Sequence, residues 1–287
     1  MLELPTRIAY HKIIQTGRMA ERLGADILGL GAFTSVVGDG GITVAKSLDM
    51  PVTTGDAYTV AMAVQAIRAA ASVMGISLSE ATAAVVGATG AIGKICSEIL
   101  AQDVAVLYLI GKTPEKLDQL HEKLREHAHA NLIKSTDARD VKNAQLILTV
   151  SSAAHAIIHP EYLRPGSVIC DVARPRDVSA QVASARDDVL VIDGGVVEVP
   201  GQVDFNFDFG FPPGKAYACM AETMALTLEG RFENYTLGKD ITIQQVDEIE
   251  QMAKKHGFRL SGFRSFEKPV TQKQIEQVRK HAAKKFG

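Results

Sequence analysis

Short apolar runs alternate with amphipathic windows through the middle third of the chain, a pattern typical of strands and helices that follow one another in a parallel sheet. The runs of strand length fall at residues 83–86, 104–110, 132–134, 146–150, 168–172 and 189–192. The helical windows between them fall at residues 91–101, 114–127 and 176–185. Six such strands make a complete dinucleotide-binding fold, so the pattern predicts an α/β protein with a doubly wound, Rossmann-type parallel sheet.

The pattern changes to helices on both sides of this region. The helical windows there fall at residues 7–23, 58–74, 216–228, 243–256 and 272–286. We expect the first and last segments to fold together as a second, mainly helical lobe, with an active cleft between the two lobes. The predicted domains are an N-terminal part of the substrate lobe (1–80), a dinucleotide-binding Rossmann domain (81–195) and a C-terminal helical part of the substrate lobe (196–287).

Composition and charge exclude several classes of protein. The 287 residues include 31 Lys and Arg against 33 Asp and Glu, and the net charge of −2 gives no basic field for a nucleic-acid backbone. The three cysteines cannot form a closed set of disulfides, and neither they nor the eight histidines have metal-site spacing. No uncharged apolar window reaches the ~18 residues of a membrane span. We therefore expect a cytoplasmic protein with no metal site, no membrane span and no nucleic-acid partner.

A glycine-rich segment follows the first predicted strand and opens a helix. It reads Gly87-Ala88-Thr89-Gly90-Ala91-Ile92-Gly93. Glycines allow a tight turn and a close approach of backbone to a pyrophosphate, and the helix N-terminus adds N–H donors. Thr89 stands where the second glycine of the usual G-x-G-x-x-G spacing would be. The setting after a strand favours cofactor binding by these residues over a purely structural turn.

The end of the second predicted strand indicates which dinucleotide binds. NAD enzymes place an acidic residue there for the ribose 2′-hydroxyl, whereas this chain has Lys112 and Thr113, which suit a 2′-phosphate. We therefore expect NADP(H), while an exposed loop lysine remains the other interpretation of Lys112. The ends of the fourth and sixth strands add four residues to the expected cofactor site: Val150, Ser151, Gly194 and Gly195.

Three cysteines compete for the role of nucleophile. Cys170 lies within an apolar strand and Cys96 on an apolar helical face, so both are typical of small buried hydrophobic side chains. Cys219 falls in the first turn of a predicted helix, where the helix dipole and the nearby Lys215 favour a thiolate. From spacing alone, a buried structural role for Cys219 stays open as well.

The last helical window and the residues before it are strongly basic. From residue 268 onward the chain has one acid, Glu276, and six basic residues: Lys268, Lys273, Arg279, Lys280, Lys284 and Lys285. Such a charge run is usually a solvated helix face. The alternative is a docking surface for an acidic carrier protein.

Six segments resemble those of one known family, in the same order and over nearly the whole chain. They begin at Leu30 (LGAFTSV), Thr54 (TGDAYT), Ala84 (AVVGATGAIG), Val191 (VIDGGVVE), Ala216 (AYACMAETM) and Leu228 (LEGRFENYTLG). The family is that of the long-chain fatty acyl-[acyl-carrier-protein] reductases of cyanobacteria, with relatives described as amino-acid or shikimate/quinate-type dehydrogenases. The small-residue loops at 31–35 and 53–59 suit the lining of a cleft, or ordinary helix caps.

The resemblance implies that NADPH reduces an acyl thioester to an aldehyde while the acyl group is held on a cysteine. Cys219 matches the family's nucleophile position. The implied partner is a small-molecule acyl thioester, carried by acyl carrier protein or by coenzyme A. The acyl-carrier reductases have an additional N-terminal segment before the point where this sequence begins, so we expect a shorter substrate or an internal start.

Two other functions stay open. A direct carbonyl dehydrogenase of the shikimate/quinate or amino-acid type would need a lysine and a carboxylate. Lys46 resembles the lysine of that family, but Thr59 stands where the carboxylate belongs. The non-enzymatic alternative is a cofactor-sensing regulator built on the same fold.

Overall fold

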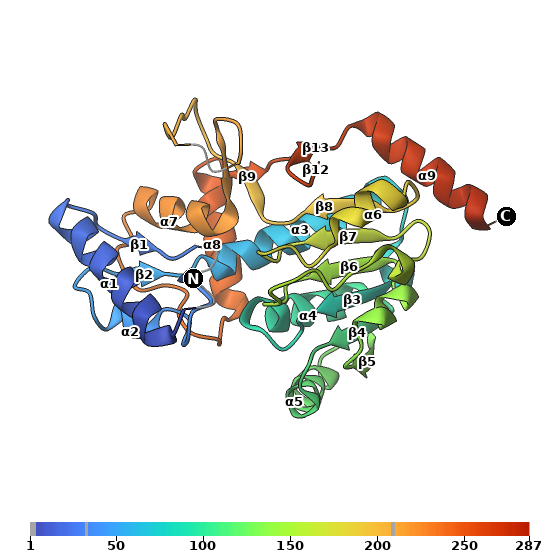
Figure 1. The fold of residues 1–287 in the computed structure, drawn as a ribbon, viewed down its shortest axis with the longest axis horizontal. Coiled ribbons are helices and arrows are strands. Elements are labelled where there is room, and N and C mark those ends of the chain that lie inside the picture. The colour runs from blue at the N-terminus through green and yellow to red at the C-terminus, as the bar shows by residue number, and fades with distance from the viewer. Residues whose placement is uncertain (1–3, 32–33, 208–209, 287) are drawn as a thin grey trace. The chain divides into compact units, whose positions relative to one another are not determined.

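Two compact units make up the protein, which was analysed as a computed structural model describing residues 4–31, 34–207 and 210–286 (Figure 1). The sheet unit comprises residues 63–194 and 262–287, and the helical unit comprises residues 1–62 and 195–261. The chain therefore passes between the two units three times.

Six parallel strands form the centre of the sheet unit, in the order β5-β4-β3-β6-β7-β8 (Figure 1). They are β3 (Thr82–Val86), β4 (Val106–Ile110), β5 (Asn131–Ser135), β6 (Leu146–Thr149), β7 (Val168–Asp171) and β8 (Leu190–Asp193). All six predicted strands are confirmed. The first strand, β3, lies between β4 and β6, which is the topology of a doubly wound dinucleotide-binding fold.

Helices and short strands complete the sheet unit. They are the second part of α3 (Asp56–Met74), η2 (Leu78–Glu80), α4 (Ala91–Asp103), α5 (Pro114–Arg125), η3 (Ala138–Asn143), η4 (Pro160–Tyr162), α6 (Ala180–Ala185), β12 (Arg264–Ser265), β13 (Lys268–Pro269) and α9 (Gln272–Phe286). Strands β3, β6, β7 and β8 are buried on both faces, which explains why they are nearly continuous apolar runs, whereas the edge strand β5 is partly exposed. Ile147 and Ile169 pack on one face with Val182 of α6, while the Cys170 sulfur on the other face lies 3.9 Å from the Ala63 carbonyl of α3.

The helical unit is built around a small core beneath α1. Its elements are α1 (Thr6–Arg22), β1 (Leu28–Gly29), α2 (Ile42–Ala45), β2 (Val52–Thr53), the first part of α3, β9 (Val196–Glu198), β10 (Lys215–Tyr217), α7 (Ala218–Leu228), α8 (Ile243–Lys255) and β11 (Arg259–Leu260). Ala9 and Ile13 of α1 pack with Leu30, Val44 and Val52. This core places β1 and β2 side by side as a parallel pair.

Two predicted helices start later than expected. The helix expected from residue 216 begins at Ala218, because residues 215–217 pair as β10 with β9. The helix expected from residue 176 begins at Ala180, where the Ser179 side chain accepts the N–H of Gln181. Residues before Ser179 stay in a loop because their polar side chains bind the ends of the sheet strands.

The unit boundaries differ from the predicted domains. Residues 63–80 and 262–287 group with the sheet rather than with the helical elements. The second part of α3 covers a face of the sheet, and α9 is tied to the sheet unit by Lys285, whose ammonium lies 3.1 Å from the carboxylate of Asp188. One of the basic residues of the tail, Lys285, is thus paired within the protein. Lys268 belongs to β13 instead of the last helix.

Among the described helices, α3 alone is long and apolar enough to cross a membrane by length and composition. Of its apolar window, 67% is buried inside the protein. A buried core helix passes the same test, so this is weak evidence for a membrane span.

The ion pair between Lys285 of α9 and Asp188 leads to a prediction about how the stability of the protein depends on pH. Asp188 is fully buried, and the hydrogen bonds from Arg186 lower its pKa to about 2, with Lys285 adding to the effect. A lowered pKa stabilises the fold above the unfolded-state pKa near 4, and this stability is lost as the pH falls towards 2. Asp188→Asn is expected to lower the free energy of unfolding by about 2 kcal/mol at pH 7.

Urea denaturation at several pH values measures this effect. The difference between Asp188→Asn and wild type should shrink as the pH is lowered towards 3. Asp187→Asn is the control: the exposed Asp187 carboxylate lies 2.9 Å from His281 and 4.0 Å from Lys285, and such exposed pairs should contribute less than about 1 kcal/mol. A loss that stays constant across this pH range would contradict the assignment.

Candidate active site

The glycine segment after β3 forms a tight turn at the point where the strand order reverses. Gly87 has φ +84°, and a Cβ there would lie 2.9 Å from the backbone N and Cα of Ser151, which follows β6. Only glycine fits this conformation and this approach. The turn therefore brings the predicted residues Gly87, Val150 and Ser151 together at the carboxyl ends of β3 and β6, where α/β folds bind dinucleotides.

The other residues of the segment complete a cradle. A Cβ on Gly93 would lie 2.1 Å from the Gly87 carbonyl oxygen, so the third glycine lets α4 pack directly against the turn. The N–H of Lys94 donates to the Gly90 carbonyl at 3.0 Å. The N–H groups that precede Lys94 in α4 take no part in the hydrogen bonds within the helix. These features fit the pyrophosphate of a dinucleotide.

Thr89 occupies the place of the missing second glycine. Its side chain lies beside Gly111 at the end of β4, where a Cβ on that glycine would be 3.3 Å from both Thr89 Oγ1 and Cγ2. The next residue, Lys112, is exposed, and Thr113 precedes α5 as its N-cap residue. A cation and a hydroxyl thus follow β4 next to the glycine turn, as the sequence predicted.

A buried carboxylate that the sequence analysis missed holds the loop after β6. Asp177 is fully buried and accepts the Ser151 N–H at 2.9 Å, the Ser151 hydroxyl at 2.5 Å and the Thr149 hydroxyl. The hydroxyl of Ser151 is therefore used within the protein, and its backbone is fixed against Gly87. Asp177 follows no strand directly, so no spacing signal in the sequence indicated it.

The two predicted glycines after β8 fall in different units. Gly194 is in the sheet unit, where a Cβ would lie 2.9 Å from the Cys170 sulfur. Gly195 is in the helical unit, and its carbonyl accepts the N–H of Ala218 at 2.7 Å. The glycine pair is thus where the chain leaves the sheet and reaches the start of α7.

The three cysteines have different environments. Cys96 and Cys170 are fully buried, and burial raises the pKa of the Cys96 thiol to about 12 and that of Cys170 further still. Both therefore stay protonated, as expected of structural thiols. Cys219 is only half-buried and is the second residue of α7, which confirms its predicted position in the first turn of a helix.

Two glycines bring small-residue loops against Cys219. A Cβ on Gly55 would lie 2.3 Å from Cys219 Cα and 2.4 Å from its Cβ, and Gly55 has φ +77°. A Cβ on Gly31 would lie 3.5 Å from the Cys219 sulfur. The loop at 53–59 therefore touches the backbone of the thiol residue, and Gly31 lies near the sulfur. Ala32 and Phe33 of the other loop are outside the described residues.

Two carboxylates beside Cys219 were also missed. Glu222, the third residue after Cys219 on α7, is fully buried and accepts hydrogen bonds from the hydroxyls of Thr53 and Thr236. Burial raises the pKa of Glu222, although these bonds oppose the shift. Asp56, at the start of α3, has its pKa raised to about 7 by burial first and by the charge of Glu222 second.

The sequence predicted that Lys215 would assist the thiolate. In the structure, its ammonium donates to the Ser261 carbonyl at 3.2 Å and lies 3.6 Å from the Glu198 carboxylate. Lys215 thus lies beside Glu198, which also pairs with Arg259 at 2.6 Å. The first turn of α7 remains the main source of positive potential for a thiolate at Cys219.

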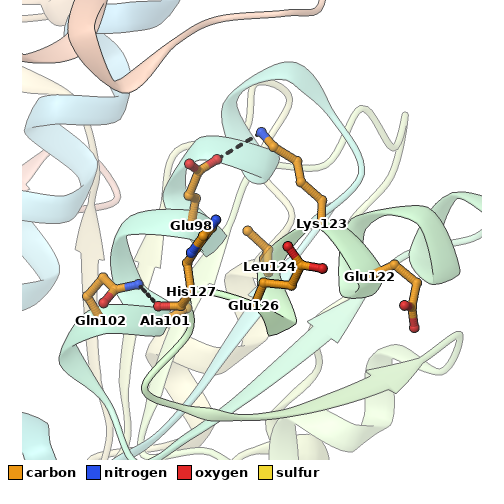
Figure 2. Close-up of a pocket in the computed structure, with 8 residues that line it drawn as sticks. All are labelled: Glu98, Ala101, Gln102, Glu122, Lys123, Leu124, Glu126 and His127. Carbon is orange, nitrogen blue, oxygen red and sulfur yellow. Dashed lines mark hydrogen bonds and ion pairs between the residues drawn. The ribbon is translucent and has the colours of Figure 1, made fainter.

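One cavity of the sheet unit lies away from the glycine turn. It has a volume of about 400 Å³ between the later halves of α4 and α5 (Figure 2) and is lined by Glu98, Ala101, Gln102, Glu122, Lys123, Leu124, Glu126 and His127. It lies at the other end of α4 from the glycine turn. Within residues 4–31, 34–207 and 210–286, no group of three His, Cys, Asp or Glu side chains could hold a metal ion.

Residues 68–193 match the family model described as Shikimate / quinate 5-dehydrogenase. This part of the chain is therefore similar to that family. The matched residues run from α3 to the end of β8, so they include the glycine turn and all six strands of the sheet. This confirms the expected resemblance to dehydrogenases with a Rossmann-type sheet.

Two curated proteins are similar over most of the chain. "Aminotransferase PigE" from a Serratia species is 32% identical over 261 residues, which are 90% of this chain and 31% of that protein. "Long-chain acyl-[acyl-carrier-protein] reductase" from Synechococcus elongatus is 29% identical over 266 residues, which are 88% of this chain and 76% of that protein. The chain thus spans about a third of the first relative's length and about three quarters of the second's.

Similarity to solved structures is weaker. "Glutamyl-tRNA Reductase from Methanopyrus kandleri" has a TM-score of 0.38 and 18% identity, covering 79% of this chain and 43% of that one. This similarity carries no argument about function.

The contact between Gly55 and Cys219 leads to a prediction about stability. Gly55→Ala places a methyl group 2.3 Å from Cys219 Cα, so the loop must separate from α7. We expect a loss of roughly 2–4 kcal/mol in the free energy of unfolding. Gly24→Ala is the matched control, since Gly24 has φ +84° with nothing within 4 Å, and should lose only about 1 kcal/mol. Equal losses in urea denaturation would show that the contact is unimportant.

The raised pKa of Asp56 predicts an opposite pH dependence to that of Asp188. The folded pKa of about 7 lies above the unfolded value near 4, so the stabilising contribution is complete at low pH and is lost as the pH rises through 7. Asp56→Asn stays neutral and should stabilise the protein by roughly 1–3 kcal/mol more at pH 8.5 than at pH 5, relative to wild type. Asp49→Asn, at an exposed position, should show no such trend in denaturation experiments.

Proposed function

We propose that the protein is a cytoplasmic, NADPH-dependent reductase that converts an acyl thioester to an aldehyde through an acyl group held on Cys219. The observation that carries the proposal is the arrangement around this thiol. It lies in the first turn of α7, half-exposed, with Gly31 near the sulfur and Gly55 packed on its backbone. A helix N-terminus favours a thiolate, which is the nucleophilic form of cysteine.

The chemistry begins with attack of the Cys219 thiolate on the thioester carbonyl carbon. A new carbon–sulfur bond forms, the bond to the carrier sulfur breaks, and the carrier leaves as a thiolate that takes up a proton. After reduction, the bond between Cys219 and the former acyl carbon breaks, which releases the aldehyde and restores the thiolate. N–H groups of the first turn of α7 suit the developing oxyanion.

The dinucleotide is assigned to the glycine turn of the sheet unit. Gly87, Gly90 and Gly93 would hold its pyrophosphate, and Lys112 with Thr113 would bind the 2′-phosphate of NADPH. When bound, NADPH supplies the hydride that reduces the enzyme-held thioester. This requires the nicotinamide to reach the acyl group on Cys219.

Proton transfer is assigned to Asp56. Its pKa of about 7 lets this carboxyl hold a proton at neutral pH, while Cys96 and Cys170 are too deeply buried to exchange one. A group that titrates near neutrality is suited to protonate a departing thiolate or alkoxide.

Acyl carrier protein is the proposed carrier of the acyl group, on the basis of a similar protein and of the positive charge on α9. One relative is named as an acyl-[acyl-carrier-protein] reductase. Lys280 and Lys284 of α9 are exposed, and their positive charges would attract an acidic carrier protein. Lys285 is instead paired with Asp188. Coenzyme A remains the alternative carrier.

Replacing the thiol tests the proposal. Cys219→Ser should reduce aldehyde formation from an acyl thioester at least a hundredfold, because an alcohol in this place is a far weaker nucleophile than a thiolate. The NADPH dissociation constant, measured by fluorescence titration, should stay within twofold of the wild-type value. Cys170→Ala is the control that removes a buried thiol. Native turnover by Cys219→Ser would refute the covalent route.

Replacing the cation after β4 tests the choice of cofactor. Lys112→Asp should weaken NADPH binding by about 1–3 kcal/mol and leave NADH binding nearly unchanged, since only NADPH carries the 2′-phosphate. Lys116→Asp, at another exposed lysine on α5, controls for the general change of charge. Equal affinity of the native protein for both cofactors would contradict the assignment.

A second candidate is favoured by the family match, namely a dehydrogenase acting directly on a carbonyl or alcohol of the shikimate/quinate or amino-acid type. In that reaction Asp56 would transfer the proton, and Cys219 would have no covalent role. Asp56→Asn would then abolish activity while Cys219→Ser retained it. The thioester route predicts that Cys219→Ser is the more severe change.

A further inference from the structure

Glu222 connects three parts of the helical unit that meet at Cys219. Its Oε1 atom accepts the hydroxyls of Thr53 and Thr236, and its Oε2 atom accepts the backbone N–H of Tyr58 at 2.8 Å. Thr53 ends β2, Tyr58 is in the first turn of α3, and Thr236 lies between α7 and α8. One carboxylate on α7 thus binds residues from all three segments.

The partners of this carboxylate flank Gly55. Thr53 and Tyr58 lie on either side of the glycine whose backbone touches Cys219. Between them, Thr54 is fixed as well, because its N–H and its hydroxyl both donate to the Thr236 carbonyl at 2.9 Å. The turn over residues 53–58 is therefore held onto α7 by Glu222 and its two threonine partners, and we call this arrangement the carboxylate clamp.

A buried carboxylate is a costly way to join these segments. Glu222 is fully buried, and apolar side chains of similar volume often stabilise a protein as well as a buried ionic group does. Unlike an apolar side chain, the carboxylate fixes the orientation of the segments that bind it, because hydrogen bonds to its oxygens are directional. The nearest feature that depends on this geometry is the contact of Gly55 with Cys219.

We propose that Glu222 is a positioning residue for Cys219. Through the carboxylate clamp it keeps the 53–58 turn pressed on the start of α7, which limits access to the thiol and fixes the direction in which the sulfur meets an acyl donor. It touches neither substrate nor cofactor. The inference rests on the proposed function only in taking Cys219 to be the acyl acceptor.

Two reactions of Cys219 test the clamp in opposite directions. Alkylation by iodoacetamide, followed by peptide mass mapping, measures access to the thiol. Single-turnover acylation by a saturating acyl-coenzyme A measures its productive alignment. Glu222→Ala should raise the alkylation rate of Cys219 at least fivefold and lower the acylation rate at least tenfold. Cys96 and Cys170 must stay unalkylated, which shows that the variant is folded.

Matched variants separate positioning from general destabilisation. Glu222→Gln keeps the shape: its one oxygen can accept the Tyr58 N–H while its NH2 group donates to the hydroxyl oxygens of Thr53 and Thr236, so both rates should stay within threefold of wild type. Glu229→Gln removes a carboxylate on the same helix that pairs with Lys255 and His256 instead, and both rates should be unchanged. If Glu222→Ala does not fold, Thr236→Val removes the hydroxyl that donates to Glu222 and lies 2.9 Å from the Thr53 hydroxyl, and it should shift both rates at least threefold in the same directions.

The result that would overturn the proposal is a folded Glu222→Ala, or the substitute Thr236→Val, with native rates of alkylation. Equal effects of Glu222→Gln and Glu222→Ala would overturn it as well. Failure of the wild-type protein to become acylated on Cys219 would instead refute the proposed function. The alkylation comparison would then still decide whether the clamp controls this thiol.

Discussion

The contact between the Gly55 backbone and the first turn of α7 is the constraint on which the candidate site depends. No side chain larger than hydrogen fits there, because a Cβ would lie 2.3 Å from Cys219 Cα. Glu222 binds donors on both sides of this glycine, and Thr54 between them donates twice to the Thr236 carbonyl, so the loop is held close to α7. The position of the half-exposed thiol follows from this packing, and so does the neighbouring carboxyl of Asp56.

The sheet unit uses the same construction for its own site. Gly87 lies against the backbone of Ser151, and buried Asp177 binds that serine through both its N–H and its hydroxyl. In each unit a glycine permits a backbone-to-backbone contact and a buried carboxylate holds the opposing segment in place. Both contacts bring two backbone segments closer together than side chains would allow, at the two places where we propose that ligands bind. This shared construction is why we assign one ligand to each unit.

The sequence predicted features that depend on local pattern. Strands β3 to β8 follow from short apolar runs, the glycine turn follows from its place after β3, and the first-turn position of Cys219 follows from the apolar helix it opens. Their periods and spacings extend over a few residues, so one sequence is enough to find them. The late starts of α6 and α7 arise from pairing with distant segments, which such patterns do not record.

The carboxylates could not be predicted for the same reason. Glu222 binds Thr53, which is 169 positions away, and Asp177 binds Thr149 and Ser151 across a loop without a spacing motif. A glutamate three residues after a cysteine on an amphipathic helix is usually exposed, so its burial here depends on tertiary packing. The grouping of α9 with the sheet likewise depends on the long-range pair of Lys285 with Asp188.

The central claim is that Cys219 carries the acyl group before any reduction takes place. Intact-mass measurement of the wild-type protein, incubated with an acyl thioester in the absence of NADPH, tests this directly. We expect a mass increase of one acyl group, located on the peptide that contains Cys219 and removed as aldehyde when NADPH is added. Aldehyde formation with NADPH, without any acylated Cys219 in its absence, would show that this thiol does not carry the acyl group.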